Sequence, residues 1–512
     1  MYPKKIFKKC VLFSGFLATV ITFGIVIICF RNLIYKAILN KVLMLQGDGP
    51  IYNAWKKNPV PLSLKLYLFN WTNPSDILNS SVKPFFKQLG PYFFDETKEK
   101  TNVTWNDVEG TVTFRHLKRW WFNAEKSSRN LSDPVTSINP IALASAITVK
   151  NWNFVVKKAL DIMMQSMSIS VNSTHTAGEI MFYGYEDPIL NVGNKFGFSQ
   201  LPNFDKFGWF YTRNDSELYE GEFIMDTGAK GNFGELLFWK GMNSTPFYRG
   251  ECGKVGGSAG EFFPNNMTKE LIIKFFSPDL CRYLELEFEE EVVVNGILGY
   301  KYVAGDRFLD NGNIKPNQSS KCKINSSCIV GTKIKENKCF CEGACMPSGA
   351  LNVSTCRYDS PAFVSLPHFL KADPHYRRII DGMEPQKDRH EFYMIFEPRT
   401  GIPLQVAARL QVNLLLQSIS GFRFLEKIPE VYVPILWFEQ TVTVPESMTL
   451  YLKIFNNFEV ICLALGICCI FCSIVCKICY CYKICQSIVS NRKINEKYSR
   501  EEVPLTLQNT SS

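Results

Sequence analysis

Two long apolar runs, one near each end of the chain, dominate its pattern of hydrophobic and polar positions. Residues 10–30 contain no charged side chain, and neither do residues 460–476. A helix rises about 1.5 Å per residue, so about 20 apolar residues cross a hydrocarbon core of about 30 Å. We therefore expect transmembrane helices at residues 10–30 and 458–476.

The first apolar run could also be a cleaved signal peptide, since four lysines precede it. However, the run is longer than the apolar core of a signal peptide, and it ends at Phe30-Arg31 rather than at a small-residue cleavage site. We therefore expect an uncleaved anchor.

Basic residues cluster in the two tails. Residues 1–9 carry four lysines, and residues 477–512 carry six Lys or Arg against three Glu, so the net charge of +9 resides mainly there. The positive-inside rule then predicts a cytosolic N-terminal tail (1–9), an extracellular or lumenal ectodomain (31–457) and a cytosolic C-terminal tail (477–512). Arg31, Lys36 and Lys41 favour the opposite orientation weakly.

Strand patterns dominate residues 31–457. Residues 62–68 and 284–289 alternate apolar and polar side chains, and residues 431–444 are rich in β-branched and aromatic residues. Alternation with a period of two predicts half-buried antiparallel strands. The glutamates of 284–289 could form an acid/base or metal site, but a solvated strand face is the simpler interpretation. With no repeat or long linker, we expect one large domain.

One stretch predicts a helix. Residues 141–167 contain neither Pro nor Gly, and Pro140 suits a helix start. At 100° per residue, Lys157, Lys158 and Asp161 lie on the same side as Lys150, and apolar side chains lie opposite. Such a cationic stripe is usually a solvated face, and the alternative is a surface that attracts anionic ligands.

Glycosylation sequons and cysteines both place the large loop outside the cytosol. Asn-x-Ser/Thr sequons in the loop start at Asn70, Asn79, Asn102, Asn130, Asn172, Asn214, Asn243, Asn266, Asn317, Asn325 and Asn352. Eight of the 18 cysteines cluster in the loop: Cys252, Cys281, Cys322, Cys328, Cys339, Cys341, Cys345 and Cys356. An even, clustered set in an oxidising compartment indicates disulfides. Zinc is the rival interpretation, but no His lies between Cys322 and Cys356.

The chain offers no credible catalytic constellation. Residues 256–260 fit G-x-S-x-G, but their flanks supply neither the strand nor the helix that a nucleophile elbow needs. No H-x-x-H, P-loop or G-x-G-x-x-G occurs. We therefore expect no enzyme activity, no cofactor and no metal. With little net charge between the tails, nucleic acid is not an expected partner.

Cysteines also crowd the inner edges of the expected spans. Thiols beside a membrane on the reducing side are candidates for S-acylation, and small apolar filler is the alternative role. The candidates are Cys10, Cys476, Cys479, Cys481 and Cys485.

Several segments together resemble the class B scavenger receptor family, which includes fatty-acid translocase, the lysosomal integral membrane protein, croquemort and the sensory neuron membrane proteins. The resemblance covers nearly the whole chain. It is carried by PVPLSLKLYLFNWTNP (59–74), LGPYFF (89–94), GYEDPIL (184–190), YRGECGKVGGSAGEFFP (248–264), FFSPDLCRYL (275–284), CFCEGACMPSGALNVSTC (339–356), SLPHFL (365–370), GIPLQVAARLQVNLLL (401–416) and YVPILWFEQ (432–440).

The resemblance implies an α+β membrane protein. Its β-rich antiparallel, barrel-like ectodomain would carry an apical helical bundle and enclose an apolar tunnel, anchored by two transmembrane helices. It also implies three disulfides, Cys252–Cys339, Cys281–Cys356 and Cys341–Cys345. Cys322 and Cys328 are additional to the family's usual six, and we expect them to pair with each other.

The resemblance also implies a function. A cell-surface receptor of this kind would bind lipids, lipoproteins or lipid-exposing particles at the apex and pass apolar ligand down the tunnel to the membrane. The candidate apical residues are Lys150, Phe154, Lys157 and Lys158. Fatty-acid translocase has lysines just after the apical helix, whereas residues 165–170 here have none.

Three alternatives remain. Within the family, the chain could be a sorting receptor of endosome or lysosome membranes, although the tail at 501–506 lacks a complete acidic dileucine signal. From other classes, it could be a two-span ion channel, although neither span offers ionisable pore-lining groups, or a tethered hydrolase. The ligand's identity and the oligomeric state, with a homo-oligomer among the options, stay open.

Overall fold

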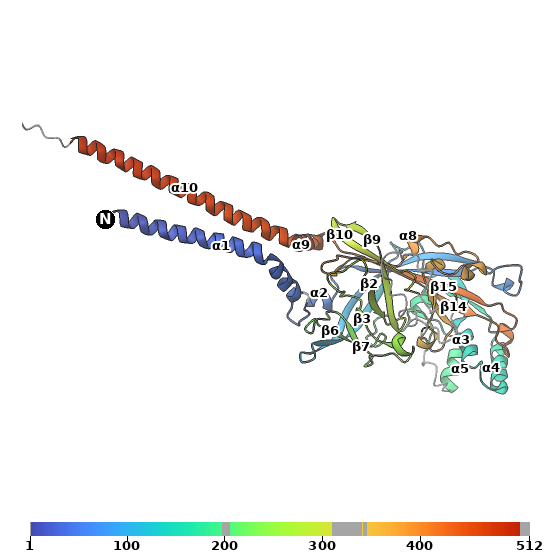
Figure 1. Cartoon of the computed structure of the whole chain (residues 1–512). Coiled ribbons are helices and arrows are strands. Elements are labelled where there is room, and N and C mark those ends of the chain that lie inside the picture. The colour runs from blue at the N-terminus through green and yellow to red at the C-terminus, as the bar shows by residue number, and fades with distance from the viewer. Residues whose placement is uncertain (1, 43, 197–204, 310–339, 341–345, 502–512) are drawn as a thin grey trace, which may run out of the picture. The chain divides into compact units, whose positions relative to one another are not determined.

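The computed structural model describes residues 2–42, 44–196, 205–309, 340 and 346–501, and it divides the chain into two compact units (Figure 1). The first unit, the helical unit, comprises the two terminal segments, up to Lys41 and from Leu450. The second unit, the barrel unit, is formed by Val42–Thr449.

The helical unit contains two long apolar helices, α1 (Tyr2–Val42) and α10 (Phe458–Glu501). Within them, Lys9–Val42 and Phe458–Ile494 are long and apolar enough to cross a membrane. Most of their large apolar side chains, such as Leu12 and Phe471, are exposed to the surroundings. Such an outward apolar surface is typical of helices that lie in lipid.

The two helices run antiparallel against each other. The rings of Phe13 and Tyr480 lie 4.3 Å apart near one end, and those of Tyr35 and Phe458 lie 6.2 Å apart near the other. Between these contacts, a Cβ atom on Gly24 would lie 2.9 Å from the carbonyl oxygen of Gly466. Glycine at this crossing therefore lets the two backbones approach closely.

The barrel unit is built around one large antiparallel sheet. Its strands follow the order β7-β6-β3-β2-β1-β15-β14-β13-β10-β9-β8, with β12 added beside β14 and β11 beside β12. The strands are β1 (Leu62–Trp71), β2 (Phe86–Asn106), β3 (Thr111–Phe122), β6 (Glu222–Asp226), β7 (Leu236–Trp239), β8 (Ile273–Ser277), β9 (Arg282–Val294), β10 (Ile297–Val303), β11 (Ala350–Asn352), β12 (Ala362–Ser365), β13 (Tyr393–Phe396), β14 (Pro403–Leu416) and β15 (Val431–Thr443).

A short segment brings the two edges of this sheet together. The N–H of Leu236, on β7, donates to Gly257, while Ser258 exchanges backbone hydrogen bonds with Lys274 and Phe276 on β8. Gly257 has a φ of +80°, and a Cβ there would lie 2.8 Å from the Lys274 carbonyl. The glycine therefore permits the close approach that nearly closes the sheet into a barrel.

Helices gather at one end of the barrel unit, at the far end from the turn between β9 and β10 (Figure 1). A two-stranded ribbon, β4 (Pro134–Ile138) and β5 (Asn172–Thr176), holds two of them between its strands. The elements of this end are α3 (Pro140–Thr148), α4 (Phe154–Ser166), the π-helical turn η2 (Glu179–Tyr183) and α5 (Pro188–Phe196). We call this end the apex.

Short helical segments complete the unit. They are α2 (Tyr52–Lys56), η1 (Pro74–Asp76), η3 (Gly250–Gly253), η6 (Ser354–Cys356), η7 (Pro367–Phe369), α7 (His375–Arg378), α8 (Lys387–His390) and η8 (Arg423–Leu425). A further helix, α9 (Glu446–Asn456), follows β15 and precedes α10.

The predicted α+β architecture with a barrel-like sheet and two apolar terminal helices is confirmed. The alternation at 62–68 is that of β1, where Leu64, Leu66 and Leu68 are buried in the main core. The glutamates of β9 are not a freely solvated face. Glu285, Glu287 and Glu289 are partly buried, and each pairs with a basic side chain.

The single helix predicted over 141–167 is wrong, because two helices occupy this stretch. The helix α3 ends at Thr148, and the side chain of Asn153 caps the start of α4 by accepting the Val156 N–H at 2.9 Å. An Asn at this position satisfies an amide that a continuous helix would bond internally. Lys150 therefore lies in the turn between the helices.

Candidate functional site

The apex begins with a helix that packs inward. Asn139 caps α3 by accepting the Ala142 N–H at 3.0 Å, and Pro140 occupies the first turn, where a missing N–H costs nothing. Ile141, Leu143 and Ala146 are buried in the main core. This helix is therefore a buried element of the apex, whereas α4 is more exposed.

The helix α4 presents apolar side chains to solvent. Phe154, Val155 and Ile162 are 70%, 74% and 57% exposed. Val155, Ala159 and Ile162 follow one another at helical spacing, and Ala159 is exposed as well. Exposed apolar patches of this kind often mark binding surfaces. We call Phe154, Val155, Ala159 and Ile162 the apolar stripe.

The opposite side of α4 buries a carboxylate, which reverses the predicted orientation of the helix. Asp161 accepts hydrogen bonds from Lys158 and Gln165, both at 2.8 Å, and from the backbone N–H of Arg423 at 2.9 Å. Burial by itself would raise the pKa of Asp161, but the bonds from Lys158 and Arg423 hold it below its usual range. The ionised carboxylate thus fixes which face of α4 points outward.

The structure brings the four candidate apical residues together on α4 and the turn before it. Phe154 opens the helix, while the ammonium of Lys157 reaches back to the carbonyl oxygen of Lys150 at 3.3 Å. Lys158 instead pairs with Asp161, which offsets its charge. Two lysines therefore remain as cationic neighbours of the apolar stripe.

An aromatic crevice lies between the ribbon β4–β5 and β15. It encloses about 10 Å³, which is room for about one water molecule. Its lining residues are Ser137, Ile138, Pro140, Ser173, His175, Ile180, Tyr185, Phe207, Trp209 and Ile435. The crevice therefore connects the base of the apex to a strand of the barrel.

Two rings stack in this crevice. The rings of His175 and Tyr185 lie 3.6 Å apart and almost parallel. Burial lowers the pKa of His175 and raises the pKa of Tyr185, so both side chains are neutral near pH 7. A neutral aromatic lining suits apolar ligands better than charged ones.

The two faces of β14 differ in character. Arg409, Gln411 and Asn413 are buried, and the segment that contains η7 and α8 covers their face through hydrogen bonds from His368 and to Asp388. On the other face, Val406, Ala408 and Val412 on β14, together with Phe438 on β15, are partly exposed apolar side chains. This apolar face is the one turned away from the covering segment.

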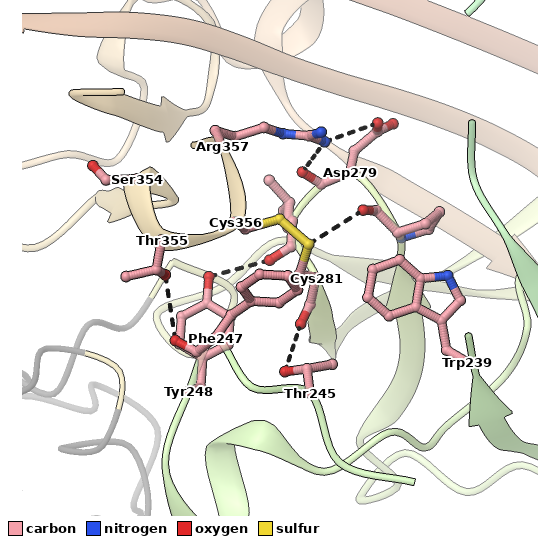
Figure 2. Close-up of a disulfide and its surroundings, with 12 residues drawn as sticks. Trp239, Thr245, Phe247, Tyr248, Asp279, Cys281, Ser354, Thr355, Cys356 and Arg357 are labelled. Atoms are coloured by element: carbon pink, nitrogen blue, oxygen red, sulfur yellow. Dashed lines mark hydrogen bonds and ion pairs between the residues drawn. A yellow bond between two sulfur atoms is a disulfide. The ribbon is translucent and has the colours of Figure 1, made fainter. Parts of the chain in front are cut away.

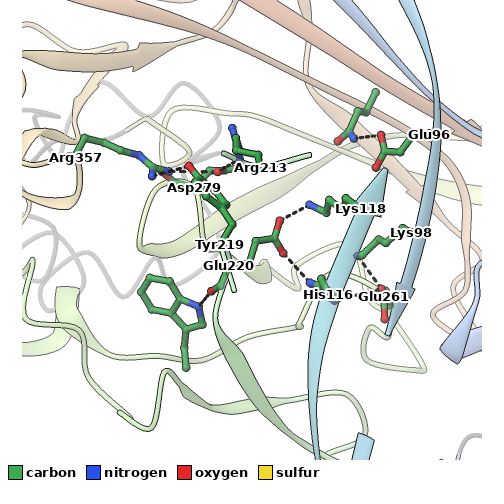
Figure 3. Close-up of polar contacts among 12 residues, drawn as sticks. Glu96, Lys98, His116, Lys118, Arg213, Tyr219, Glu220, Glu261, Asp279 and Arg357 are labelled. Carbon is green, nitrogen blue, oxygen red and sulfur yellow. Dashed lines mark hydrogen bonds and ion pairs between the residues drawn. The ribbon is translucent and has the colours of Figure 1, made fainter. Parts of the chain in front are cut away.

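A buried ionic cluster joins β2 and β3 to two loops (Figure 3). His116 lies 2.7 Å from Glu220, which also pairs with Lys118, while Lys98 lies 2.8 Å from Glu261. Burial lowers the pKa of His116 to about 4, so that histidine is neutral near pH 7. Each charge has an opposite partner, which is how buried charges are accommodated in folded proteins.

A disulfide joins Cys281 to Cys356 within the second hydrophobic core (Figure 2). Around it, Thr245 donates a hydrogen bond to the carbonyl oxygen of Cys281, and Arg357 pairs with Asp279 at 3.2 Å. The cross-link ties β9 to η6 over 75 residues of sequence. This is one of the four pairs expected from the sequence.

The other expected pairs fall on residues outside the described chain. Cys252 is disulfide-bonded, but Cys339 is not among the described residues. The same holds for both members of Cys341–Cys345 and Cys322–Cys328, and for the sequons at Asn317 and Asn325. Those pairings and sequons stay predictions.

The serine of the G-x-S-x-G match has a structural role. Ser258 is buried, its hydroxyl donates to the carbonyl oxygen of Phe262, and its backbone pairs with β8. It stands on neither the strand-to-helix turn nor the exposed tip that a nucleophile elbow needs. In the part of the chain that the structure describes, no cluster of three or more His, Cys, Asp or Glu side chains could hold a metal ion.

Sequence reasoning missed three parts of the apex. It assigned neither the crevice residues Tyr185 and Trp209 nor the outward orientation of Val155, and it gave Asp161 no buried role. The dense aromatic run at 207–211 is a signal that could have drawn attention to the crevice. The orientation of α4, by contrast, depends on a contact with Arg423, which lies 262 residues away in sequence.

The chain thus combines a nearly closed antiparallel barrel, two apolar terminal helices and an apical helix with exposed apolar side chains. A model of the CD36 family matches residues 15–484, so the chain belongs to the CD36 family. The chain is also 34% identical to Protein peste of Drosophila melanogaster over 427 residues, which are 82% of this chain and 73% of that protein.

Two further relatives carry informative names. Scavenger receptor class B member 1 of Rattus norvegicus is 32% identical over 81% of this chain and 77% of its own length. Lysosome membrane protein 2 of Mus musculus is 27% identical over 90% of this chain and 93% of its own length. The expected membership of the class B scavenger receptor family is therefore confirmed.

Proposed function

We propose that this protein is a non-enzymatic receptor that binds lipids or lipid-bearing particles at its apex and passes apolar ligand through the barrel toward the membrane. The observation that carries this proposal is the exposed apolar stripe of α4, and the apex also contains a crevice lined by Tyr185, Phe207 and Trp209. A folded domain that leaves such a surface uncovered gains free energy when an apolar ligand covers it.

The proposed route for the ligand runs through the barrel. Two features support it: the apical crevice is lined in part by Ile435 on β15, and one face of β14 and β15 has the partly exposed apolar side chains Val406, Ala408 and Phe438. Burying each CH₂ group is worth about 0.8 kcal/mol, so a long acyl chain would enter an apolar interior without an energy source. The apolar tunnel that the family resemblance implies is part of this proposal.

The charges around the stripe narrow the ligand class. Lys150 and Lys157 stand beside Phe154, whereas Lys158 is occupied by Asp161. A particle with an apolar surface and anionic headgroups would meet both kinds of contact. Lipoproteins and lipid-exposing particles have this composition.

Several features support a cell-surface topology with both tails in the cytosol. The sulfur of Cys10 lies 3.9 Å from the hydroxyl of Tyr480, so the N-terminal part of α1 lies beside the middle of α10. The candidate S-acylation cysteines Cys476, Cys479, Cys481 and Cys485 are on this same stretch of α10. The Cys281–Cys356 disulfide agrees with an oxidising compartment for the barrel unit. Residence in a lysosomal membrane is the alternative location, favoured by the likeness to lysosome membrane protein 2.

Lipid extraction from the purified full-length protein tests this function. We expect mass spectrometry to find lipid that stays bound through purification in mild detergent. Ala408→Trp would fill the partly exposed face and reduce the bound lipid, whereas Ala124→Trp, in an exposed turn, would leave it unchanged. Equal lipid content in the two variants would contradict a route through the barrel.

A further inference from the structure

Two turns of the barrel unit have exposed apolar side chains in them or directly beside them. Val108, in the turn between β2 and β3, is 86% exposed, and Val293, beside the turn between β9 and β10, is 70% exposed. Leu298, directly opposite Val293 in the strand register, is 49% exposed. We call the two turns the rim turns.

These side chains do not serve the barrel's packing. A single exposed apolar residue is ordinary in any protein. Here, however, Val293 and Leu298 form a cross-strand pair that faces outward. The glutamates that precede this pair on β9, Glu289 and Glu291, are paired with lysines. Tight turns normally carry polar residues because their backbone is solvated. Val108 in one turn and the outward apolar pair beside the other turn therefore indicate an apolar environment outside the protein.

The first rim turn lies where the chain enters the barrel unit. The carbonyl oxygen of Gly110 accepts the N–H of Thr227 at 3.0 Å, and the carbonyl oxygen of Thr227 accepts the N–H of Leu45 at 2.9 Å. Leu45 is only three residues beyond Val42, the last residue of α1. Two backbone hydrogen bonds and three residues of chain thus connect this turn to the end of an apolar helix.

The second rim turn lies where the chain leaves the barrel unit. The side-chain amide of Asn295 donates to the carbonyl oxygen of Val444 at 3.1 Å. Val444 stands two residues before α9, which leads into the apolar helix α10. The two turns are distant in sequence, yet each is fastened to one of the two segments that connect the barrel unit to the membrane helices.

The connecting helical segments are themselves apolar on exposed positions. Leu33 and Ile38 are exposed at the end of α1, among Arg31, Lys36 and Lys41. Leu450, Tyr451 and Ile454 are exposed on α9. Apolar positions interleaved with basic and aromatic ones are typical of helices that lie in the membrane interface. The chain segments on either side of the barrel unit thus have the composition of interfacial helices.

We infer that the rim turns contact the outer leaflet of the bilayer that the chain itself crosses. Val108, Val293 and Leu298 are the side chains that enter the headgroup region. The depth is limited, because Asp107 and Glu109 flank Val108 and Glu109 pairs with Lys230 at 2.8 Å. The barrel unit would thus rest on phospholipid at two points in addition to its two covalent connections.

Fluorescence quenching in lipid nanodiscs tests this inference. An environment-sensitive fluorescent amino acid replaces Val108, Val293 or Leu218 in the full-length protein, which is then placed in nanodiscs of phosphatidylcholine with or without bromine near the headgroup end of its acyl chains. Leu218 is the control, because it is 73% exposed but belongs neither to the rim turns nor to the apolar stripe. The segment just before it, Asn214 and Asp215, bonds to Trp120 and Lys118, toward the end of β3 that is remote from Val108. Each labelled protein is first checked for an unchanged melting temperature.

The expected result is quenching of about twofold or more at positions 108 and 293, because interfacial side chains lie about 5–10 Å into the boundary region, and no quenching at position 218. Absence of quenching at either rim turn overturns the inference, which requires both contacts. Equal quenching at all three positions overturns it as well, since that pattern reports random collision with lipid. None of these outcomes depends on whether the protein carries lipid through its interior.

Discussion

The carboxylate of Asp161 accepts the backbone N–H of Arg423 at 2.9 Å, and this bond joins α4 to the connection between β14 and β15. The side chain of Asp161 is 1% exposed. A polar contact thus holds the helix while its apolar residues face outward. This arrangement reverses the usual pattern of a surface helix, and it keeps the apolar stripe available for a ligand.

Replacing Asp161 should loosen the apex. Asp161→Ala leaves the Arg423 N–H without its charged acceptor, and we expect a loss of about 1–3 kcal/mol in the free energy of unfolding. Lys158→Ala removes a half-exposed partner of the same carboxylate and should cost less than about 1 kcal/mol. Denaturant unfolding of the full-length protein in detergent micelles measures both. If the two variants lost equal free energy of unfolding, the hydrogen bond from Arg423 to Asp161 would have no special role in stability.

Replacing Phe154 should weaken ligand binding without affecting stability. Phe154→Asp puts a charge into the apolar stripe, and we expect the affinity for phosphatidylcholine vesicles with anionic phosphatidylserine to fall on the order of tenfold. Leu218→Asp is the matched control, because Leu218 is equally exposed but lies outside the apical helices. Vesicle flotation compares the two variants with the natural protein. A loss of binding in the Leu218 variant alone would place the ligand elsewhere.

Acid should destabilise the barrel through a pair of buried histidines. His368 and His390 stack at 4.4 Å, and Nδ1 of His368 accepts the Glu384 N–H at 3.0 Å. Burial, together with the neighbouring His390, lowers the pKa of His368 to about 3. The unfolded chain binds a proton near pH 6.5, whereas the folded protein resists it. The contribution of His368 to stability is therefore complete above about pH 6.5 and declines as the pH falls toward 3.

This pH dependence can be measured on one variant. His368→Asn removes the titrating ring, and Asn tolerates the positive φ of 55° found there. Unfolding free energies at pH 7 and pH 5 should differ less in this variant, by at most about 1.4 kcal/mol per pH unit. His375→Asn, on α7, is the control. An unchanged pH slope in the His368 variant would remove this histidine from the acid response.

Glycans should be present on the barrel unit if it faces the outside or a lumen. Among the described sequons, Asn79, Asn102, Asn130, Asn214, Asn243, Asn266 and Asn352 are exposed, and Asn70 and Asn172 are partly exposed. Peptide N-glycosidase should therefore lower the apparent mass of the protein from eukaryotic cells by several glycans. A variant with Asn→Gln at all eleven predicted sequons of the loop, Asn317 and Asn325 included, should show no shift. An unshifted natural protein would overturn the proposed topology.

The sequence was most informative where one local pattern decides the structure. The uncharged runs predicted α1 and α10, and the alternation of Leu64, Leu66 and Leu68 predicted β1, because membrane crossing and half-buried strands each leave a direct periodic signature. The family resemblance added the barrel, which no single strand pattern reveals. The sheet order depends on pairs such as Leu64 and Gln440, which are far apart in sequence.

The apex was harder to predict because long-range contacts override the local pattern there. Helical periodicity alone predicted that Lys158 and Asp161 face solvent, whereas in the structure Asp161 is buried and accepts a hydrogen bond from Arg423. The interruption before α4 depends on whether Asn153 caps a new helix or continues an old one, and the two choices differ by about 1 kcal/mol. A difference of that size is decided by packing rather than by local sequence.

The small segment at Gly257 and Ser258 affects how the newly made protein avoids aggregation before it reaches a membrane. By bonding to both β7 and β8, it covers backbone groups on which a second chain could otherwise add a strand. Sheets with open edges are prone to polymerise when proteins are made at high local concentration. A variant that lost the backbone bonds of Gly257 and Ser258 would therefore first show aggregation of newly made protein. The molecules that did fold would have no functional defect.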